Sequence, residues 1–173
     1  MSNTPINVGL GEIAVSSDPE DILVAYGLGS CVAVGLWDPK QGIAGLLHAV
    51  LPERANGADR NPADRNPANR FSGKYVDSGI EGLLLAMQKA GAEQRRLVTC
   101  IAGGANMLVN ASLGQSFEIG GRNVQSAYQT MQRLGLRLRA KQVGGNCGRT
   151  VRLYVADGRM TVRTVGGKEE DLI

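Results

Sequence analysis

Short apolar runs rich in β-branched residues fill the first fifty positions of the chain and alternate with Gly and Asp-Pro. The pattern predicts β-strands, because each run is short and turn-forming residues separate it from the next. The runs cover residues 6–15, 22–26, 31–37 and 43–50. The last one is almost wholly apolar and stops at Pro52, so we expect a buried strand there.

Two later stretches place apolar residues three to four positions apart, the spacing that gathers them on one face of a helix. Residues 74–90 are the first, and Gly91 ends it; the second begins at about Arg122 and ends at Gly135. The apolar positions are Val76, Ile80, Leu83, Leu84 and Met87 in the first helix, and Val124, Tyr128, Met131 and Leu134 in the second.

The remaining segments again have the pattern of strands. Residues 97–102 form an apolar run, and residues 136–141 alternate strictly between apolar and basic, which is typical of a half-exposed strand. Two further runs, 151–155 and 160–165, are joined by an Asp-Gly pair that favours a hairpin. Regular βαβ alternation is missing. The sequence therefore predicts an α+β fold, strand-rich, with two long helices packed on mixed or antiparallel sheets.

Two segments are expected to be poorly ordered. Residues 58–70 read ADRNPADRNPANR, a five-residue repeat without any apolar side chain larger than Ala. Such a loop buries too little surface to offset its ordering entropy, so we expect it to be mobile. Residues 168–173 are expected to fray at the C-terminus.

Composition narrows the class of protein. With 43% hydrophobic and 20% charged residues, the 173 residues suit one globular domain over 1–173. The net charge is only +3, and Lys and Arg are interleaved with acids, which disfavours nucleic-acid binding. No run reaches the roughly 18 apolar residues of a membrane span, and the start of the chain does not resemble a signal peptide. We therefore expect a cytoplasmic protein without membrane insertion.

The three cysteines, Cys31, Cys100 and Cys147, have spacings that fit neither a disulfide framework nor a zinc site. In the cytosol they would stay reduced. One histidine and scattered cysteines give no close ligand pairs, so we expect neither a metal nor another cofactor.

Cys31 follows a glycine-rich turn, Gly27-Leu28-Gly29-Ser30, at the start of a predicted strand. Glycines allow a tight backbone path that leaves peptide N–H groups unobstructed. An acyl-transfer nucleophile needs this arrangement: a thiol in a cleft with N–H donors, here from Gly29 and Ser30 onward, to stabilise an oxyanion.

A thiol also needs a base, since its pKa of roughly 8.5 leaves little thiolate at neutral pH. His48 is the only histidine, and it lies on the strand after the one that Cys31 begins, across a short connection. A competing interpretation stays open at this point: a lone histidine on an apolar strand is more often a core residue, and a buried cysteine is more often inert.

Several segments together carry a resemblance to a known family. They are GLGSCVAVGLWDP (27–39), GIAGLLHAVLP (42–52), KYVDSGI (74–80), AGGANML (102–108), IGGRN (119–123) and VGGNCGRT (143–150). They occur in the same order over nearly the whole chain as in the CheD family of chemoreceptor glutamine deamidases, which this sequence resembles.

The resemblance implies a catalytic cysteine at Cys31 and a histidine at His48. It implies that the protein hydrolyses glutamine side chains on the cytoplasmic domain of chemoreceptors, through a thioester. It also implies a second role, as binding partner of a CheC-type phosphatase with weak or no catalysis. A broader thiol hydrolase, such as a protease or a transglutaminase-like enzyme, has no independent support in the sequence.

One position departs from the family. Its members usually carry a threonine six residues before the cysteine as the third catalytic group, and here that residue is Ala25. Orientation of the imidazole then falls to Ser30, Thr99, a backbone carbonyl or water, or the activity is lowered.

The other glycine-rich turns are candidates for the cleft wall. Gly103 and Gly104 lack the Lys-Ser/Thr of a phosphate-binding loop, so we expect them to form a turn near the active site. Asn146 and Arg149, beside Gly144 and Gly145, are expected to line the cleft or a partner surface. Cys147 lies in this flexible turn and Cys100 in an apolar strand; we expect neither to be catalytic.

Overall fold

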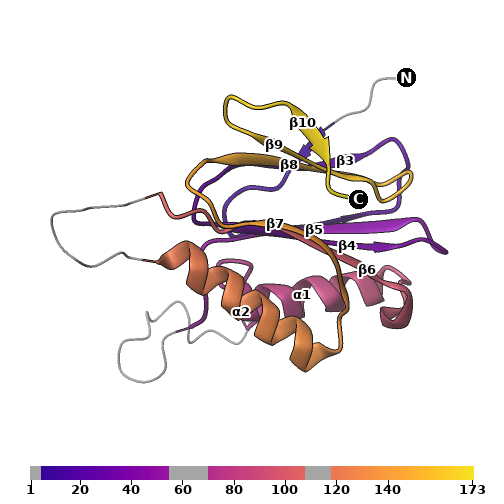
Figure 1. Ribbon diagram of the computed structural model, residues 1–173. Helices are drawn as coiled ribbons and strands as arrows, with labels where there is room; N and C mark the ends of the chain where they lie inside the picture. Colours follow the sequence, from indigo (N-terminus) through magenta and orange to yellow (C-terminus); the bar gives the residue numbers. More distant parts are fainter. Residues whose placement is uncertain (1–4, 55–69, 108–117) are drawn as a thin grey trace, which may run out of the picture.

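The chain folds into three layers, two β-sheets packed face to face and two helices on the outer face of one of them (Figure 1). The structure is a computed structural model, and it describes residues 5–54, 70–107 and 118–173. Among the described residues, two α-helices and ten strands in two mixed sheets confirm the predicted single α+β domain.

The central sheet lies between the other two layers. Its strands, in spatial order, are β2 (Ile13–Ser16), β5 (Ile43–Ala49), β4 (Val32–Asp38), β6 (Val98–Gly103) and β7 (Leu138–Val143). All neighbours are antiparallel except β6 and β7. Because both of its faces are covered, every residue of β5 is buried, as the apolar run predicts.

The second sheet closes the molecule on the side away from the helices. Its strands, in spatial order, are β1 (Pro5–Asn7), β3 (Ile22–Leu28), β8 (Arg149–Tyr154), β9 (Met160–Thr164) and β10 (Glu169–Asp171). The short β1 pairs with β3 in parallel, and β8 and β9 form the expected hairpin.

The expectation of a frayed C-terminus is wrong. Residues 169–171 form β10, which pairs antiparallel with β9. The physical reason lies just beyond the strand, where the backbone N–H of Leu172 donates to the carbonyl of Met160 at 2.8 Å. The side chains of Leu172 and Ile173 pack against the core between the sheets. The tail therefore buries apolar surface, although the residues before these two, 168–171, are all charged.

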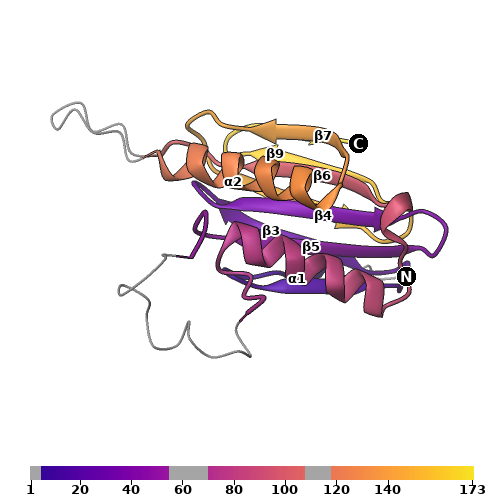
Figure 2. The same cartoon turned by 90° about the horizontal axis from the view of Figure 1, so that it is seen from below.

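Both helices lie side by side across the central sheet (Figure 2). They are α1 (Val76–Lys89) and α2 (Ile119–Leu134), and a short 3₁₀ helix, η3 (Gln94–Arg96), leads into β6. Gly135 ends α2 in the left-handed conformation at φ 70°, as predicted. The helix begins at Ile119, three residues before the predicted start at Arg122. The sequence pattern does not predict this first turn, because Ile-Gly-Gly does not continue the apolar periodicity.

Successive side chains of β4 point to opposite faces of the central sheet and so belong to two separate hydrophobic cores. Val32, Val34 and Leu36 face the helices, whereas Ala33, like Cys31 just before the strand, faces the second sheet.

The loop predicted to be mobile, residues 58–70, lies outside the described residues apart from Arg70, its last residue. Its mobility therefore stays a prediction. No helix in the described ranges is long and apolar enough to cross a membrane.

Candidate active site

Cys31 lies in the tight connection between β3 and β4, where its carbonyl meets the end of β6 at Gly103. The start of α2 lies at the same end of the central sheet (left in Figure 1). Its side chain faces the layer between the two sheets, and the residue is only 8% exposed. Burial raises the pKa of the Cys31 thiol above its ordinary 9.0, and the residue's own backbone N–H lowers it by a smaller amount.

Three successive carbonyls of this connection are held by hydrogen bonds. The Gly29 carbonyl accepts from the Ala105 N–H at 2.8 Å, and the Cys31 carbonyl accepts from the Gly104 N–H at 2.7 Å. Between them, the Ser30 carbonyl accepts from the side-chain amide of Asn123 at 2.8 Å. Among the described residues, the N–H groups of residues 29, 30 and 31 donate to no backbone carbonyl.

His48 lies near the end of β5 and pairs directly with Ala33 of β4, two residues after Cys31. It alternates with Leu47, which faces the helices, so its ring enters the same inter-sheet layer as the thiol. Residues placed diagonally on neighbouring strands are within reach of long side chains. The two predicted catalytic side chains therefore share one face of one strand pair.

The His48 ring is oriented by the backbone. Nδ1 lies 3.0 Å from the carbonyl oxygen of Val8, and a carbonyl can only accept, so Nδ1 carries the proton. Nε2 is left with a free lone pair and has no hydrogen-bond partner among the described residues. The Val8 peptide is itself fixed, because its N–H donates to Val24 of β3 at 2.8 Å.

The contact with Val8 shows which group orients the imidazole when position 25 carries an alanine instead of a threonine. Of the candidate orienting groups, a backbone carbonyl is the one that bonds His48. Thr99 lies opposite Leu36, toward the other end of β4, and Ser30 contributes its carbonyl to Asn123 instead. The imidazole thus keeps its tautomer without a hydroxyl at position 25.

Burial favours the neutral form of both groups. It lowers the pKa of His48 below 6.5, although the Val8 carbonyl and the charge of Glu12 partly oppose this effect. No hydrogen bond joins the Cys31 sulfur to the imidazole. The resting pair is therefore a thiol and an unprotonated imidazole rather than a preformed ion pair.

Glycines allow three segments to meet beneath the cysteine turn. A Cβ on Gly103 would lie 2.3 Å from the Cys31 carbonyl oxygen, and one on Gly120 would lie 2.4 Å from the carbonyl oxygen of Ala105. Gly104 has a φ of +65°, and a Cβ there would lie 2.3 Å from Val124 of α2. Gly103, Gly104 and Gly120 thus permit the close packing of these segments.

The residues predicted to line the cleft divide into two groups. Gly104 borders a hollow of about 200 Å³ beside the turn, together with Asn106, Glu118, Gly121, Gly144 and Gly145. Gly103 and Arg149 are buried behind it, where the guanidinium donates to the carbonyls of Gly103, at 2.6 Å, and Gly144. Asn146 is exposed on the adjoining loop, and none of its contacts reaches Cys31.

The other two cysteines have different surroundings. Cys100 is buried in β6, where burial raises its pKa to about 11, as expected of a packing residue. Cys147 is exposed beside Asn146. Within residues 5–54, 70–107 and 118–173, no group of three His, Cys, Asp or Glu side chains could hold a metal ion.

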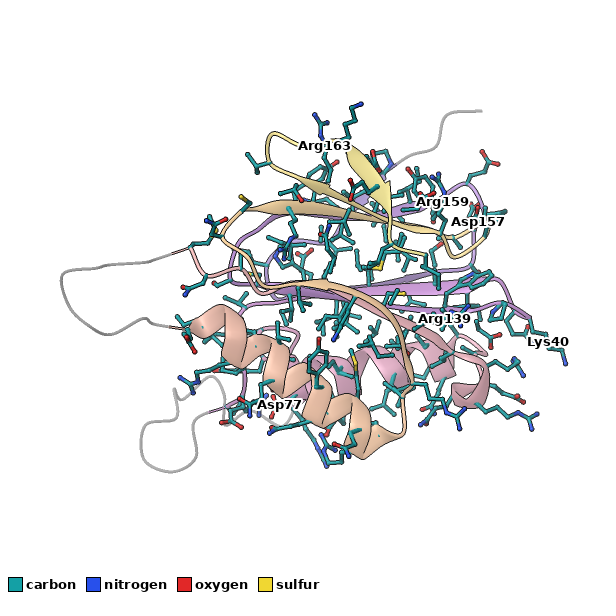
Figure 3. The ribbon with its side chains drawn as sticks, in the orientation of Figure 1. Lys40, Asp77, Arg139, Asp157, Arg159 and Arg163 are labelled. Atoms are coloured by element: carbon teal, nitrogen blue, oxygen red, sulfur yellow. The ribbon has the colours of Figure 1, made fainter. Side chains whose placement is uncertain are left out.

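A larger groove, of about 570 Å³, is remote from Cys31. It lies at the far end of β4, where it is lined by Trp37 and by charged residues that include Arg139, Asp157 and Arg159. Figure 3 shows these three at the end of the molecule opposite the start of α2. Its size alone does not make it the reaction site, because its lining contains neither a cysteine nor a histidine.

Two residues of the site escape prediction from the sequence. Val8 acts through its carbonyl, which every residue possesses, so no side-chain signal marks it. Asn123 is fully buried and binds both Ser30 and Val50; its only signal is its place in the IGGRN segment.

Comparison with known proteins identifies the family. The profile described as "CheD chemotactic sensory transduction" matches residues 50–164. The chain is 41% identical over 165 residues to "Probable chemoreceptor glutamine deamidase CheD" of Symbiobacterium thermophilum, and the match covers 95% of each chain. Proteins of the same name from Pyrococcus abyssi and Thermococcus kodakarensis are 43% and 41% identical, over 94% and 92% of this chain and 93% and 92% of their own. The chain therefore belongs to the CheD family.

Proposed function

We propose that this protein is a chemoreceptor glutamine deamidase with Cys31 as nucleophile and His48 as general base. The names of its relatives support the substrate. The observation that carries the chemistry is the Nδ1 contact with Val8, since it leaves Nε2 as a proton acceptor on the face that also holds the thiol. A histidine that merely packed in the core would have no need of an unpaired Nε2 there.

The reaction proceeds in two halves. Nε2 of His48 takes the thiol proton as the Cys31 sulfur bonds to the amide carbon of a glutamine side chain, and the carbonyl electron pair moves onto oxygen. The N–H groups of residues 29–31, which donate to no backbone carbonyl among the described residues, are the proposed donors to that oxyanion. The carbon–nitrogen bond then breaks, the imidazolium returns the proton to nitrogen, and ammonia leaves a thioester.

Hydrolysis completes the cycle. His48, neutral again, takes a proton from water as its oxygen attacks the thioester carbon. The carbon–sulfur bond breaks, and the proton returns to the sulfur. The products are a glutamate side chain and the free thiol. On a receptor bundle, the new carboxylate adds one negative charge, which alters the packing of neighbouring helices through charge repulsion.

Peptide mass measurement tests this proposal. The wild-type protein is incubated with the cytoplasmic fragment of a chemoreceptor, and glutamine-containing peptides are weighed before and after. We expect a gain of about one dalton, as amide nitrogen is replaced by oxygen. Cys31→Ala should abolish the gain, and Cys147→Ala, a matched change at an exposed cysteine, should preserve it. A gain that survives Cys31→Ala would contradict the assignment.

Binding to a CheC-type phosphatase, implied by the resemblance, stays a prediction. A Cys31→Ala protein retains the surface of the site without its thiol, so its affinity for such a phosphatase can be measured apart from catalysis. Tight binding by a wild-type protein that shows no mass gain on receptors would favour a purely regulatory role.

A further inference from the structure

Asn123 joins the two halves of the proposed active site through one amide group. Its Nδ2 donates to the carbonyl of Ser30 at 2.8 Å and to the carbonyl of Val50 at 2.9 Å. Ser30 directly precedes the nucleophile, and Val50 lies two residues after His48. The side chain is fully buried on α2, so neither bond competes with solvent.

The identity of this side chain matters more than its shape. Both partners are carbonyl oxygens, so only a group with two N–H donors satisfies them together. The carbonyls on either side, those of Gly29 and Cys31, are held by backbone N–H groups that any sequence would supply. Ser30 alone depends on a side chain.

Peptide geometry carries this contact to the reaction centre. The Ser30–Cys31 peptide bond is trans, as are all those in the described ranges, so its C=O and N–H point in opposite directions. Asn123 draws the Ser30 carbonyl toward α2, on the outer side of the central sheet. The Cys31 N–H must then point to the other side, where its own thiol lies.

We infer that Asn123 is a positioning residue that aims the Cys31 N–H at the oxyanion formed during deamidation. The inference rests on the proposed function, because an oxyanion forms only if a thiolate adds to a carbonyl. Without the amide, the Ser30–Cys31 peptide is free to rotate, and the donor leaves the direction in which the charge develops. Losing an oxyanion donor outright costs roughly 100- to 1,000-fold in kcat.

The test compares two reactions of the same sulfur. Deamidation needs the oxyanion donor, whereas alkylation of Cys31 by iodoacetamide displaces iodide and forms no oxyanion. For Asn123→Ala we expect kcat on the receptor fragment to fall about 30-fold or more, with KM and the Cys31 alkylation rate each within about threefold of wild type. Alkylation is followed on the peptide that contains Cys31, because Cys147 also reacts.

Ser126 provides the matched control on the same helix. It is also buried, and its hydroxyl donates to the Pro52 carbonyl at 2.6 Å without contacting the nucleophile turn. Ser126→Ala removes a comparable buried bond between α2 and the segment after β5, so kcat and alkylation should both stay within about twofold of wild type. Thermal unfolding of every variant verifies that it is folded.

Asn123→Asp keeps the inference testable if Asn123→Ala does not fold. The introduced carboxyl group has the same shape, donates one hydrogen bond when protonated and none when ionised. Its kcat relative to wild type should therefore fall as pH rises, a dependence that a purely structural role does not produce.

Three results would overturn the inference. One is a kcat for Asn123→Ala within threefold of wild type. Another is a parallel loss of deamidation and alkylation, which would indicate a collapsed site. The third is a wild-type protein without deamidase activity, which removes the proposed function as well; the first two leave that function intact.

Discussion

His48 keeps its proton on the ring nitrogen that faces the backbone, and this leaves Nε2 unprotonated and able to accept a proton. The cause is the Val8 carbonyl at 3.0 Å from Nδ1, itself held by the pairing of the first strands. A backbone group cannot be lost by substitution, so the tautomer depends on the fold of residues 5–8 rather than on a third catalytic side chain.

The pH dependence of the reaction should reflect this buried, neutral imidazole. Burial lowers the pKa of His48 below 6.5, and only the unprotonated ring accepts the thiol proton. We therefore expect kcat/KM on a receptor fragment to rise with pH through a midpoint below 6.5 and then to level off. A midpoint above neutrality would contradict this expectation, because the rate would then follow ionisation of the thiol and not of His48.

Ala25 gives a second prediction at the residue scale. Because Val8 already occupies Nδ1, a hydroxyl added by Ala25→Thr should change kcat by less than about twofold. Ala25 is fully buried in the core between the sheets, so the two extra atoms should lower the free energy of unfolding by about 1–3 kcal/mol. Urea denaturation and steady-state kinetics measure the two effects. A tenfold rise in kcat would mean that His48 lacks an orienting group in the native protein.

Some residues of the candidate site can be predicted from the sequence alone, and others cannot. Cys31 and His48 can be chosen from it, because a thiol after a glycine turn and a lone imidazole on the next strand are chemically distinctive. Arg149 and Gly104 can be placed near them only by resemblance. Val8 and Asn123 act through geometry that exists only after the two sheets and α2 have packed.

Among the elements, the glycine-rich end of β6 allows the turn that contains Cys31, residues 29–31, to pack closely against it. Gly103 has a φ of +110°, and its missing Cβ leaves room for the Cys31 carbonyl. The loops that follow β6 and β7 are then tied together, since the Gly144 N–H donates to the Gly103 carbonyl at 3.0 Å. The shape of the site is therefore set by backbone contacts between elements.

Alanine substitutions at Gly91 and Gly103 separate the cost of backbone strain from the cost of a steric clash. Gly91 has nearly the same φ as Gly103, +106° against +110°, but a Cβ there would meet only Ile43 at 3.9 Å. Gly91→Ala should cost about 1–2 kcal/mol of unfolding free energy from backbone strain and leave activity intact. Gly103→Ala adds a contact of 2.3 Å with the Cys31 carbonyl, so it should cost more and reduce kcat.

Urea denaturation and kinetics on the receptor fragment, run on both variants, check this pair. Equal losses of stability in the two, together with an unchanged kcat for Gly103→Ala, would show that the turn tolerates a displaced carbonyl.

Elements differ in how well their sequence predicts them. Strands with an apolar face and the periodic parts of both helices are visible in the sequence, because burial requires those patterns. The first turn of α2 and the strand β10 are not. The former contains Gly120, which packs on the backbone of Gly104 and Ala105, and the latter is charged on its exposed face and held by pairing with β9.

At the scale of the whole molecule, the buried carboxylate of Asp38 and the proposed site at Cys31 lie at opposite ends of β4. Asp38, at the end of β4 remote from Cys31, is fully buried. It accepts two hydrogen bonds from Arg96, at 3.0 and 2.8 Å, and others from the N–H groups of Lys40, Gln41 and Glu93. One carboxylate thus connects β4, the turn to β5 and the segment that leads into β6.

Removing this carboxylate should weaken the fold without touching catalysis. Asp38→Ala leaves Arg96 unpaired and is expected to cost about 3 kcal/mol of unfolding free energy at neutral pH. The Arg96 guanidinium holds the pKa of Asp38 well below 3.8, so this stabilisation is present above that pH and is lost as pH falls below it.

Urea denaturation at neutral and acidic pH measures the effect, with the exposed Asp157→Ala as control. A difference between wild type and Asp38→Ala that does not shrink in acid would contradict the role of the charge. The kcat of folded Asp38→Ala should match that of wild type.

The central proposal for the whole molecule is that a glutamine side chain of a receptor is hydrolysed through a thioester on Cys31. The most direct test is deamidation of a receptor fragment in water enriched in heavy oxygen, with peptide masses as readout. Hydrolysis of a thioester takes one oxygen from water, so the converted peptide should gain about three daltons with wild type and nothing with Cys31→Ala. A peptide that gains no mass with wild type, or the same mass with Cys31→Ala, would contradict the account.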